Sequence, residues 1–360
     1  MKNNRKVDVV VDLQFGSTGK GLLCDFLAVA GKYDTVVNAN LPNAGHTTVT
    51  PEGRVWMHKA MPNAVMVSKR IMMGPGSAFS PARLAEELKG VADLIEGKIF
   101  VIHEACMIVT QEMKDKEQQT LSRISSTMQG SGEAVVSKIR REVGAIARDQ
   151  MPLLAEYGLD KYVVSHADYL QHLLDSESIL VEGAQGYSLG HNSGFYPYCT
   201  SRDCTVTRYM ADCAIPAGWL RKAIGVARLH PIRVGNTADG FSGDIYPDQE
   251  ELTWEQLGVA PELTTVTKRV RRVFSFSYAQ IHEAIIANGI DEVMLNFVNY
   301  NPHQAVDVIE QVNEMMGDLG YIDKDIITMV GTGPRRDQVI SVQEFLDRYE
   351  ERGYGAEDCE

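Results

Sequence analysis

The sequence predicts an α/β protein with a mostly parallel central sheet, flanking helices and loop or small-subdomain excursions. Short apolar runs typical of buried strands alternate with stretches at helical spacing, and a glycine-rich turn joins the first run to the first helix. A chain of 360 residues with 44% hydrophobic residues is long enough for one large core. Because no internal repeat or linker interrupts it, we expect a single domain over residues 1–360.

The first strand and helix are predicted by residues 7–31, VDVVVDLQFGSTGKGLLCDFLAVAG. Residues 7–13 are rich in valine and alternate little, as in a parallel strand that is covered on both faces. Residues 20–30 then place leucine and phenylalanine side chains at helical spacing up to Gly31. The stretch therefore predicts a strand, a glycine turn and a helix.

The remaining elements follow the same alternation. Residues 80–95 open with Ser-Pro, a signal for the start of a helix, and predict one structural helix. Residues 120–133, TLSRISSTMQGSGE, are polar and contain glycine, so we expect a loop or lid of the kind that often touches a ligand. Further apolar runs predict buried strands at 35–39, 70–73, 99–102, 179–181, 223–227, 292–296 and 326–329.

Composition limits the classes of partner. With 48 acidic and 35 basic residues, the net charge of -13 argues against a nucleic-acid backbone as the main partner. The six cysteines form no CxxC pair, as expected of thiols in a reducing cytosol, so a zinc site is not expected. No apolar run reaches the roughly 18 residues that span a bilayer. We therefore expect a cytoplasmic protein with no membrane partner.

The turn at residues 16–21, GSTGKG, is the first candidate binding element. Its glycines let backbone N–H groups approach an anion, and the helix that begins near Lys20 adds its positive dipole end and an ammonium group. The spacing matches neither a Walker A loop nor GxGxxG, and an ordinary tight turn would also explain it. The turn is a candidate phosphate cradle that carries no carboxylate.

Two further clusters follow buried strands. Residues 43–47, NAGHT, fall at the same carboxyl edge of the sheet, where ligands of open α/β sheets bind. The imidazole of His46 has a reference pKa of about 6.5, suited to acid catalysis or phosphate binding, although a lone histidine is more often structural. In residues 182–186, EGAQG, the amide of Gln185 suits a purine edge, but a simple turn would also explain the glycines.

The last two clusters are a basic run and a late glycine loop. Residues 265–272, TVTKRVRR, place four cations within five residues of an acidic protein. Guanidinium groups bind carboxylates and phosphates in a bidentate way, which favours anion binding over a solvated basic face. Residues 330–334, VGTGP, follow a predicted strand and suit the wrapping of a nucleotide.

In their order and spacing these motifs resemble the adenylosuccinate synthetase family over most of the chain. The family pattern runs WGDEGKGK, NAGHT, a GNG…SP segment, a TTG-type loop followed by paired arginines, EGAQG, YPYVTS, RVG, TTGRxRR and STGP. The counterparts here are FGSTGKGL, NAGHT, GPG with Ser80-Pro81, Ser126-Thr127 with Arg140-Arg141, EGAQG, YPYCTS, RVG, TVTKRVRR and GTGP.

The resemblance implies a ligase that works in two steps. A nucleoside triphosphate phosphorylates the purine O6, and the amino group of L-aspartate then displaces that phosphate at C6. Phosphorylation turns a poor leaving group into a good one, while Mg²⁺ and a helix N-terminus neutralise charge. The resemblance also implies Mg²⁺ as the cofactor and a homodimer as the assembly.

The resemblance further implies a set of site residues. Catalysis would rest on Ser17, Lys20 and His46, with Ser17 and Gly45 as metal ligands. The aspartate substrate would contact Thr265, Val266, Thr267, Arg269 and Arg271. The purine monophosphate would contact Ser17, Asn43, Ser126, Thr127, Gln185, Thr200, Arg269 and, from a partner subunit, Arg141. The triphosphate would contact Thr18, Gly19, Lys20, Gly21, Gly45, His46, Thr47, Arg271, Asn299, Gly331, Thr332 and Gly333.

The phosphate turn departs from the family. Ordinary members carry GDEGKG, whose aspartate removes the purine N1 proton and ligates Mg²⁺; here that position is Ser17, and Thr18 replaces the glutamate. A serine hydroxyl is not an unassisted base at neutral pH, so either the protein is inactive or its substrate makes different demands. A guanine carries a 2-amino group beside N1, which a small uncharged serine accommodates.

This substitution resembles the phage-type branch of the family, the 2-aminoadenylosuccinate synthetases that act on dGMP on the way to 2-aminoadenine DNA. Water or a phosphate oxygen would replace the lost base. The family motif TKLD aligns with residues 296–299, NFVN, and Asn299 suits the adenine of ATP or dATP better than guanine. Lys268 replaces the glycine of TTGR, a change for which the sequence offers no account.

The leading expectation is therefore a ligase that joins L-aspartate to C6 of dGMP, driven by ATP or dATP, to give 2-amino-2′-deoxy-N6-succinyladenylate. If phage-encoded, it would act in the host cytoplasm. The choice of dGMP over GMP rests on the resemblance alone. The alternatives are an ordinary adenylosuccinate synthetase that uses IMP and GTP, and a catalytically inactive nucleotide-binding relative.

Overall fold

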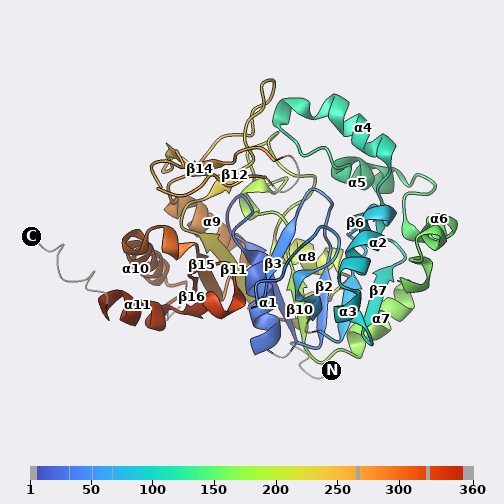
Figure 1. Cartoon of the computed structure of the whole chain (residues 1–360), viewed down its shortest axis with the longest axis horizontal. Helices are drawn as coiled ribbons and strands as arrows, with labels where there is room; N and C mark the ends of the chain where they lie inside the picture. Colours follow the sequence, from blue (N-terminus) through green and yellow to red (C-terminus); the bar gives the residue numbers. More distant parts are fainter. Residues whose placement is uncertain are drawn as a thin grey trace, which may run out of the picture.

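The protein is built on one large twisted sheet with helices on both sides (Figure 1). The computed structural model describes residues 6–31, 33–50, 52–66, 68–264, 268–321 and 325–351. Within them, the sheet has the strand order β17-β16-β15-β11-β1-β10-β2-β5-β7-β9. Every pair of neighbours is parallel except β16 and β17, so the predicted fold class is confirmed.

All the predicted strands are present, with small differences at their ends. The largest difference is at β11, which begins at Leu220 rather than at 223. Two short edge strands, β9 and β17, were not predicted. The strands are β1 (Val7–Asp12), β2 (Thr35–Asn38), β5 (Arg70–Met73), β7 (Ile99–His103), β9 (Val163–Val164), β10 (Ile179–Glu182), β11 (Leu220–Arg228), β15 (Glu292–Asn296), β16 (Ile327–Gly331) and β17 (Val339–Ser341).

Within the described residues, the smaller excursions form three minor sheets. The hairpin of β3 (His46–Val49) and β4 (Val55–His58) pairs His46 with His58. The other two sheets are β6 with β8, and β12-β14-β13. Their strands are β6 (Ala78–Phe79), β8 (Met107–Ile108), β12 (Ile232–Arg233), β13 (Glu251–Leu252) and β14 (Arg272–Phe274).

The expectation of one helix over residues 80–95 was wrong, because the segment forms α2 (Pro81–Gly90) and α3 (Ala92–Ile95). The backbone leaves the helical region at Val91, where φ is -124°. A glycine followed by a β-branched residue is a weak helix former, and here the Val91 side chain is buried. The other helices are α1 (Lys20–Ala30), α4 (Gln111–Thr120), α5 (Ser131–Arg140), α6 (Met151–Glu156), α7 (His166–Leu174), α8 (Val206–Asp212), α9 (Tyr278–Asn288), α10 (Pro302–Asp318) and α11 (Val342–Glu351).

The sheet separates two hydrophobic cores. On one face Val9 packs in a cluster with residues of α7, α8, α9 and α10. On the other face Val10 packs in a cluster with residues of α1, α2 and α6. Every residue of β1 is buried, as the valine-rich run predicts for a strand covered on both sides.

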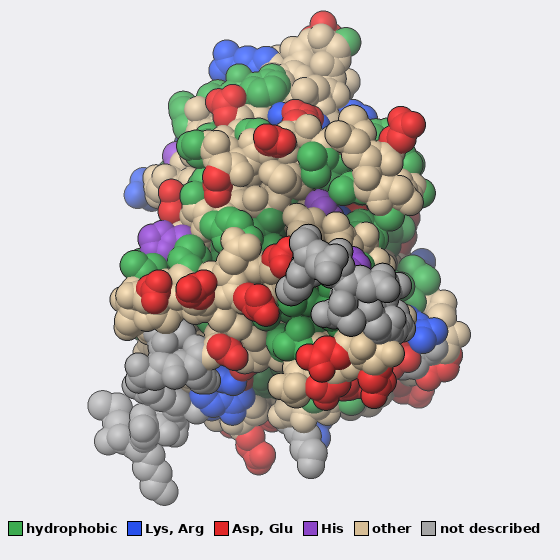
Figure 2. Space-filling view, turned by 90° about the vertical axis from the view of Figure 1, so that its left-hand side faces the viewer, with side chains coloured by type: hydrophobic (Ala, Val, Ile, Leu, Met, Phe, Trp, Pro, Cys, Tyr) green, Lys and Arg blue, Asp and Glu red, His purple; other side chains and the backbone are tan. Residues whose placement is uncertain are grey.

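The charge of the outer surface and the state of the cysteines can be compared with the expectations from composition. Acidic side chains are scattered over the face on the side of α10 and α11 (Figure 2), in keeping with the net charge of -13. The cysteines within the described residues are free, and Cys359 lies outside those residues. None of the helices that the structure describes is both long and apolar enough to cross a lipid bilayer.

Candidate active site

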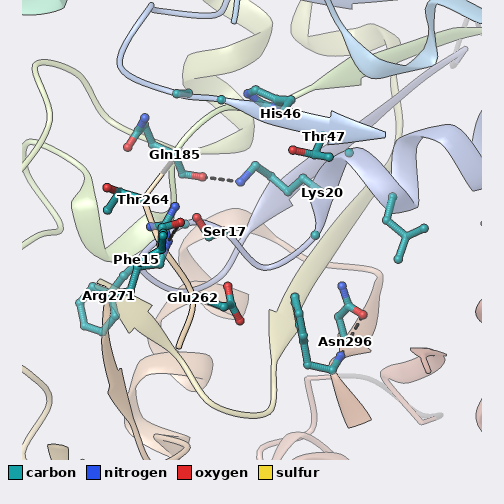
Figure 3. A pocket seen from close by; sticks show the side chains of 18 of the residues that line it. Phe15, Ser17, Lys20, His46, Thr47, Gln185, Glu262, Thr264, Arg271 and Asn296 are labelled. Carbon is teal, nitrogen blue, oxygen red and sulfur yellow. Dashed lines mark hydrogen bonds between the residues drawn. The ribbon is translucent and has the colours of Figure 1, made fainter. Parts of the chain in front are cut away.

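The carboxyl ends of the central strands open into one cavity of about 590 Å³. The turns after β1 and β10 and the hairpin that follows β2 reach this edge because these three strands are neighbours in the sheet. Another part of the wall comes from residues 262–264 and from Asn296, Phe297, Asn299 and Tyr300. Figure 3 labels Glu262, Thr264 and Asn296 among them. A second cavity of about 140 Å³ shares Asn43, Thr127 and Gln185 with the first, so the two are contiguous.

The phosphate turn adopts a left-handed backbone at several positions. The angle φ is 90° at Gly16, 57° at Ser17 and 97° at Gly19. Ser17 is exposed to the cavity, whereas Thr18 is buried beneath the turn. Nζ of Lys20 donates to the carbonyl oxygen of Gln185 at 2.8 Å, drawn as a dashed line in Figure 3. The turn thus presents glycine backbone, one hydroxyl and one ammonium group.

His46 is held by a buried carboxylate. Its Nδ1 lies 2.6 Å from Oε1 of Glu182, whose side chain is fully buried. Asn63 fixes the same carboxylate, donating from its backbone N–H at 2.7 Å and from its side-chain amide at 3.2 Å. Nε2 of His46 has no hydrogen-bond partner among the described residues, and the residue lines the cavity. With Nδ1 committed to Glu182, Nε2 is the atom left for a ligand.

Two further buried titratable groups interact electrostatically with Glu182. His58, its partner across the hairpin, has both ring nitrogens without a partner in the described structure. Burial lowers the pKa of His58 to about 4, with Glu182 acting in the opposite direction. Burial raises the pKa of Asp25 to about 6, while Arg336 at 3.5 Å opposes that rise. The surroundings of the His46–Glu182 pair are therefore largely desolvated.

Asn296 connects the phosphate turn to the late glycine loop. Its amide nitrogen donates to the carbonyl oxygen of Thr18 at 2.9 Å. A Cβ placed on Gly19 would lie 2.0 Å from that nitrogen, and one on Gly331 would lie 2.1 Å from the amide oxygen. Both glycines are therefore required for the close approach of Asn296. The Phe297 side chain lines the cavity beside it.

A buried arginine supports the opposite wall of the cavity. The Arg228 guanidinium group pairs with Glu262, donates to the carbonyl oxygen of Ser17 at 3.1 Å and stacks on Phe297 at 3.9 Å from the ring centroid. Tyr300 donates its hydroxyl to Glu262 at 3.2 Å. Burial raises the pKa of Glu262, but Arg228, Arg271 and the Tyr300 hydroxyl together outweigh burial, and the net shift is downward. Glu262 is therefore an ionised carboxylate on the cavity wall.

The basic run supplies one guanidinium group to the cavity. Burial lowers the pKa of Arg271 to about 10, and the residue lines the cavity near Thr264 (Figure 3). The indole N–H of Trp254 donates to the carbonyl oxygen of Arg271 at 2.8 Å. Lys268 has a φ of 55°, a left-handed conformation that favours glycine. The family glycine is therefore replaced without loss of the backbone conformation that it favours.

The smaller cavity is lined by hydroxyl and amide groups. The side-chain amide of Asn43 donates to the hydroxyl of Thr200 at 3.2 Å, and Ser126 and Thr127 lie on the same wall. The buried guanidinium group of Arg233 lines the cavity and is held by backbone carbonyl groups. Burial lowers the pKa of Arg233 to about 10.

The structure brings most of the predicted site residues together around the two cavities. Thr265, Val266 and Thr267 lie outside the described residues. Thr18, Arg141, Arg269, Gly331 and Thr332 line neither cavity. Those on the smaller cavity are Asn43, Ser126, Thr127, Gln185 and Thr200. Those on the larger cavity are Ser17, Gly19, Lys20, Gly21, Asn43, Gly45, His46, Thr47, Thr127, Gln185, Arg271, Asn299 and Gly333.

Arg141 is exposed, whereas Arg269 is held by hydrogen bonds to two other segments. Arg141 is exposed at the C-terminal end of α5, with a φ of 60°, away from both cavities of its own chain. Arg269 donates to the carbonyl oxygens of Ser125 at 3.2 Å and of Gly235 at 3.3 Å. Arg269 therefore fixes the loop that follows α4 to the segment after β12.

Sequence reasoning missed several residues of the site. It assigned no role to Glu182, Arg233, Glu262 or Phe297. In the structure Glu182 pairs with His46, and the other three residues line the cavity. A signal was present for Glu182, because a carboxylate that directly follows an apolar strand lies at the edge where ligands bind. The pairing of Glu262 with Arg228 joins distant segments and leaves no local signal.

Comparison with known proteins agrees with this geometry. The sequence model of the family described as adenylosuccinate synthetase matches residues 9–152 and 150–312. The N6-succino-2-amino-2′-deoxyadenylate synthase of Vibrio phage phiVC8 is 49% identical over 349 residues, covering 94% of this chain and 98% of that protein. The corresponding synthase of Acinetobacter phage SH-Ab 15497 is 41% identical over 351 residues, covering 88% of this chain and 91% of that protein.

Solved structures give the same relationship. The succinoaminodeoxyadenylate synthetase of cyanophage S-2L, bound to dGMP and to dATP as an energy donor, superposes with a TM-score of 0.87 at 36% identity, covering 97% of this chain and 99% of that chain. Adenylosuccinate synthetase from Plasmodium falciparum has the same fold, with a TM-score of 0.78 at 18% identity over 94% of this chain and 99% of that chain. The chain therefore belongs to the adenylosuccinate synthetase family.

Proposed function

We propose that the protein is a carbon–nitrogen ligase that joins L-aspartate to C6 of dGMP, driven by ATP or dATP. The observation that carries this proposal is the neutral hydroxyl of Ser17, exposed at the tip of the phosphate turn and facing the large cavity. A guanine 2-amino group has a hydrogen-bond acceptor there and meets no carboxylate at that position of the turn. The names of the phage relatives and the dGMP bound to the cyanophage enzyme support the same substrate.

The smaller cavity suits the monophosphate end of the substrate. Its wall offers the hydroxyls of Ser126, Thr127 and Thr200, which are hydrogen-bond donors to phosphate oxygens. Gln185 lies where the two cavities meet, so its amide is placed for the purine edge. In this arrangement the base extends from the smaller cavity toward Ser17 in the larger one.

In the first step, guanine O6 attacks the γ-phosphorus of the donor. The O6–P bond forms, the bond from phosphorus to the β-phosphate oxygen breaks, and the nucleoside diphosphate leaves. Nε2 of His46, oriented by Glu182, is available to stabilise the charge that develops on the transferring phosphoryl group. Lys20 contributes an ammonium group from the turn. The N1 proton passes to water or to a phosphate oxygen.

In the second step, the amino group of aspartate attacks C6. The C–N bond forms, the C6–O bond breaks, inorganic phosphate leaves and the nitrogen loses a proton. Arg271 lines the cavity and is placed to pair with a carboxylate of the amino acid. We assign Thr265, Val266 and Thr267 to the same substrate on the family resemblance, since they lie outside the described residues.

The proposed cofactor is Mg²⁺, and the residues present fit it. Mg²⁺ prefers oxygen ligands and keeps several from water and substrate phosphates, so it does not require a protein carboxylate cage. The Ser17 hydroxyl and Gly45 line the same cavity as the phosphate turn and would supply the protein oxygens. Bound there, the ion would neutralise charge on the triphosphate.

The proposed donor is an adenine nucleotide. Asn299 is exposed and lines the same cavity as Phe297 and as Gly333 of the late glycine loop. A side-chain amide both donates and accepts, which matches the mixed edge of adenine, whereas guanine offers two donors that call for a carboxylate. The dATP bound to the cyanophage enzyme is consistent with this choice.

We propose a homodimer as the active assembly, with the chain as one domain in the cytoplasm. The exposed Arg141 lies away from the cavities of its own chain, between Ile139, which is 69% exposed, and Val143, which is fully exposed. Exposed apolar side chains around a guanidinium group suit an interface that delivers the arginine to a neighbouring site.

A panel of substrates tests the proposal. The purified protein is incubated with aspartate, Mg²⁺ and each pair drawn from dGMP, GMP or IMP with ATP, dATP or GTP, and phosphate release is measured. We expect the highest kcat/KM with dGMP and an adenine nucleotide. Turnover of IMP without turnover of dGMP would overturn the proposal, and so would the absence of phosphate release with every purine.

A further inference from the structure

A buried carboxylate lies beneath the phosphate turn, and it does not line the cavity. Asp12 ends β1 and its side chain is fully buried. Its Oδ1 accepts from the backbone N–H groups of Gln14 at 2.9 Å and Gly16 at 3.1 Å. Its Oδ2 accepts from the backbone N–H of Thr18 at 3.3 Å and from the hydroxyl of the same residue. The carboxylate thus organises the turn from below.

These hydrogen bonds enclose Ser17. Asp12 accepts hydrogen bonds from the backbone N–H groups of the two neighbours of Ser17, Gly16 and Thr18. Arg228 donates to the carbonyl oxygen of Ser17 itself. A left-handed conformation costs a non-glycine residue roughly 1–2 kcal/mol, so it persists only where the surroundings impose it. Asp12 below and Arg228 beside the turn supply that restraint and keep the hydroxyl facing the cavity.

Asp12 also directs the lysine of the turn. Nζ of Lys20 donates to Oδ2 of Asp12 at 3.0 Å and to the carbonyl oxygen of Gln185 at 2.8 Å. An ammonium group has three protons, so one remains for a phosphate oxygen, and its direction is set by the other two bonds. The side chain of Lys20 is 6% exposed, which leaves it little freedom to choose another direction.

The turn after β10 closes the space around this carboxylate. A Cβ on Gly186 would lie 2.5 Å from Oδ1 of Asp12 and 2.4 Å from the backbone nitrogen of Gly16. The EGAQG segment therefore packs directly on the hydrogen bonds between Asp12 and the turn. Such burial strengthens the bonds and raises the cost of removing the charge that accepts them.

We propose that Asp12 is the positioning residue of the phosphate turn: it fixes the conformation of Ser17 and aims the third N–H of Lys20 at the triphosphate. The carboxylate of Asp12 lies beneath the turn, whereas the side chain that faces the cavity is the neutral hydroxyl of Ser17. This inference rests on the proposed function, because its main measurement is turnover of dGMP.

The test compares two buried aspartates of the same strand. Asp12→Asn keeps the shape of the side chain but removes the charge and turns an amide toward Lys20 and Thr18. The control is Asp8→Asn at the other end of β1, where the carboxylate forms a bidentate pair with Arg221, both contacts at 2.8 Å. Both variants remove the charge of a buried carboxylate that forms an ion pair, but only Asp12 contacts the phosphate turn.

We expect Asp12→Asn to lower kcat by roughly 10- to 100-fold, because charge-assisted bonds that preorganise the turn are lost. The KM for dGMP is expected to stay within about 2-fold of the wild type, because no hydrogen bond of Asp12 reaches the smaller cavity. Asp8→Asn is expected to lower the melting temperature while kcat stays within about 2-fold. All assays are run below the melting transition of each variant.

A second variant keeps the inference testable if Asp12→Asn does not fold. Thr18→Val removes only the hydroxyl that donates to Asp12, and kcat is expected to fall by roughly 5-fold. A kcat of Asp12→Asn within about 2-fold of the wild type would overturn the inference. If Asp12→Asn does not fold, an unchanged kcat of Thr18→Val would overturn it. An equal loss of kcat in Asp8→Asn would do the same.

The outcomes separate this inference from the proposed function. If the wild type releases no phosphate with dGMP, the proposed function fails. Calorimetric titration with ATP and Mg²⁺ then still tests the role of Asp12. Weaker binding of ATP by Asp12→Asn than by Asp8→Asn supports that role, and equal binding overturns it. If the wild type turns over dGMP and Asp12→Asn does so equally well, only the inference about Asp12 fails.

Discussion

His46 and Glu182 form a buried pair, with Nδ1 and Oε1 2.6 Å apart, that joins the β3–β4 hairpin to the end of β10. Because the carboxylate fixes the ring through Nδ1, Nε2 is the nitrogen left for a ligand in the cavity. We expect Glu182→Gln to lower kcat by roughly 10- to 100-fold with little change in the KM for dGMP, measured by phosphate release.

The control for that variant is Glu87→Gln. Glu87 is also buried and accepts hydrogen bonds from backbone N–H groups, at 2.8 Å from Lys59 and 3.1 Å from Ala60, but it lines neither cavity. The Glu87→Gln variant should be less stable than the wild type and should keep the wild-type kcat. Equal losses of kcat in the two variants would show that the loss reflects buried charge in general rather than the orientation of His46.

Asn299 is expected to set the choice of donor. Asn299→Asp replaces a mixed donor and acceptor by an acceptor for the two donors of guanine. The ratio of kcat/KM for ATP to that for GTP should fall by at least 10-fold, a shift of about 1.4 kcal/mol. The ratio is measured with dGMP and aspartate at saturation. An unchanged ratio would locate donor selection elsewhere in the cavity.

Ser17 is expected to set the choice of acceptor. Ser17→Asp places a carboxylate in the cavity next to the expected position of the 2-amino group and near Glu262, which is already ionised. The larger charged side chain should lower kcat/KM for dGMP by at least 10-fold. Ser17→Ala provides the neutral control and should lose less. If Ser17→Asp turns over dGMP at the wild-type rate, the serine is incidental.

Arg141 provides a test of the dimer. Arg141→Ala should raise the KM for dGMP, and Lys20→Met should abolish turnover. If each arginine serves the neighbouring site, mixing the two inactive or weakened variants after reversible dissociation should regenerate activity, because a hybrid dimer contains one intact site. Activity equal to the sum of the separate variants would place Arg141 outside any shared site.

Acid should destabilise the fold through buried histidine. Burial lowers the pKa of His58 from 6.5 to about 4, so between these values the unfolded chain binds a proton that the folded chain does not. The free energy of unfolding should therefore fall as the pH drops from 6.5 toward 4, by up to about 3 kcal/mol for this residue. In pH-dependent thermal melts, His58→Phe should lose that share of the acid sensitivity; an unchanged slope would contradict the assignment.

The central sheet was accessible to sequence reasoning because its strands are buried on both faces. The valine run of β1 and the glycine turn after it leave one interpretation, a parallel strand leading into a helix. The edge strands were not accessible: β17 has three residues and pairs antiparallel with β16. The break at Val91 was missed because local patterning cannot show that a buried valine draws the chain out of the helix.

The site was predictable where a motif supplies a ligand contact from its own backbone or side chain. The phosphate turn and Gln185 are of this kind. The supporting residues Glu182 and Arg228 were not, since they act through partners that the chain brings from distant segments. Asp12 was overlooked although its partners are local, because Lys20, its most distant partner in the turn, is only eight residues away. That the chain is one domain, that it forms a dimer and that Mg²⁺ is its cofactor stay predictions.

The hydrogen bond from Trp254 to the carbonyl oxygen of Arg271 gives the protein a built-in optical probe. The chain has three tryptophans, and the other two are Trp56 and Trp219. With both replaced by phenylalanine, fluorescence would come from the one indole attached to the basic run. A stopped-flow trace of that emission on addition of L-aspartate would report any change around Arg271 separately from the chemistry.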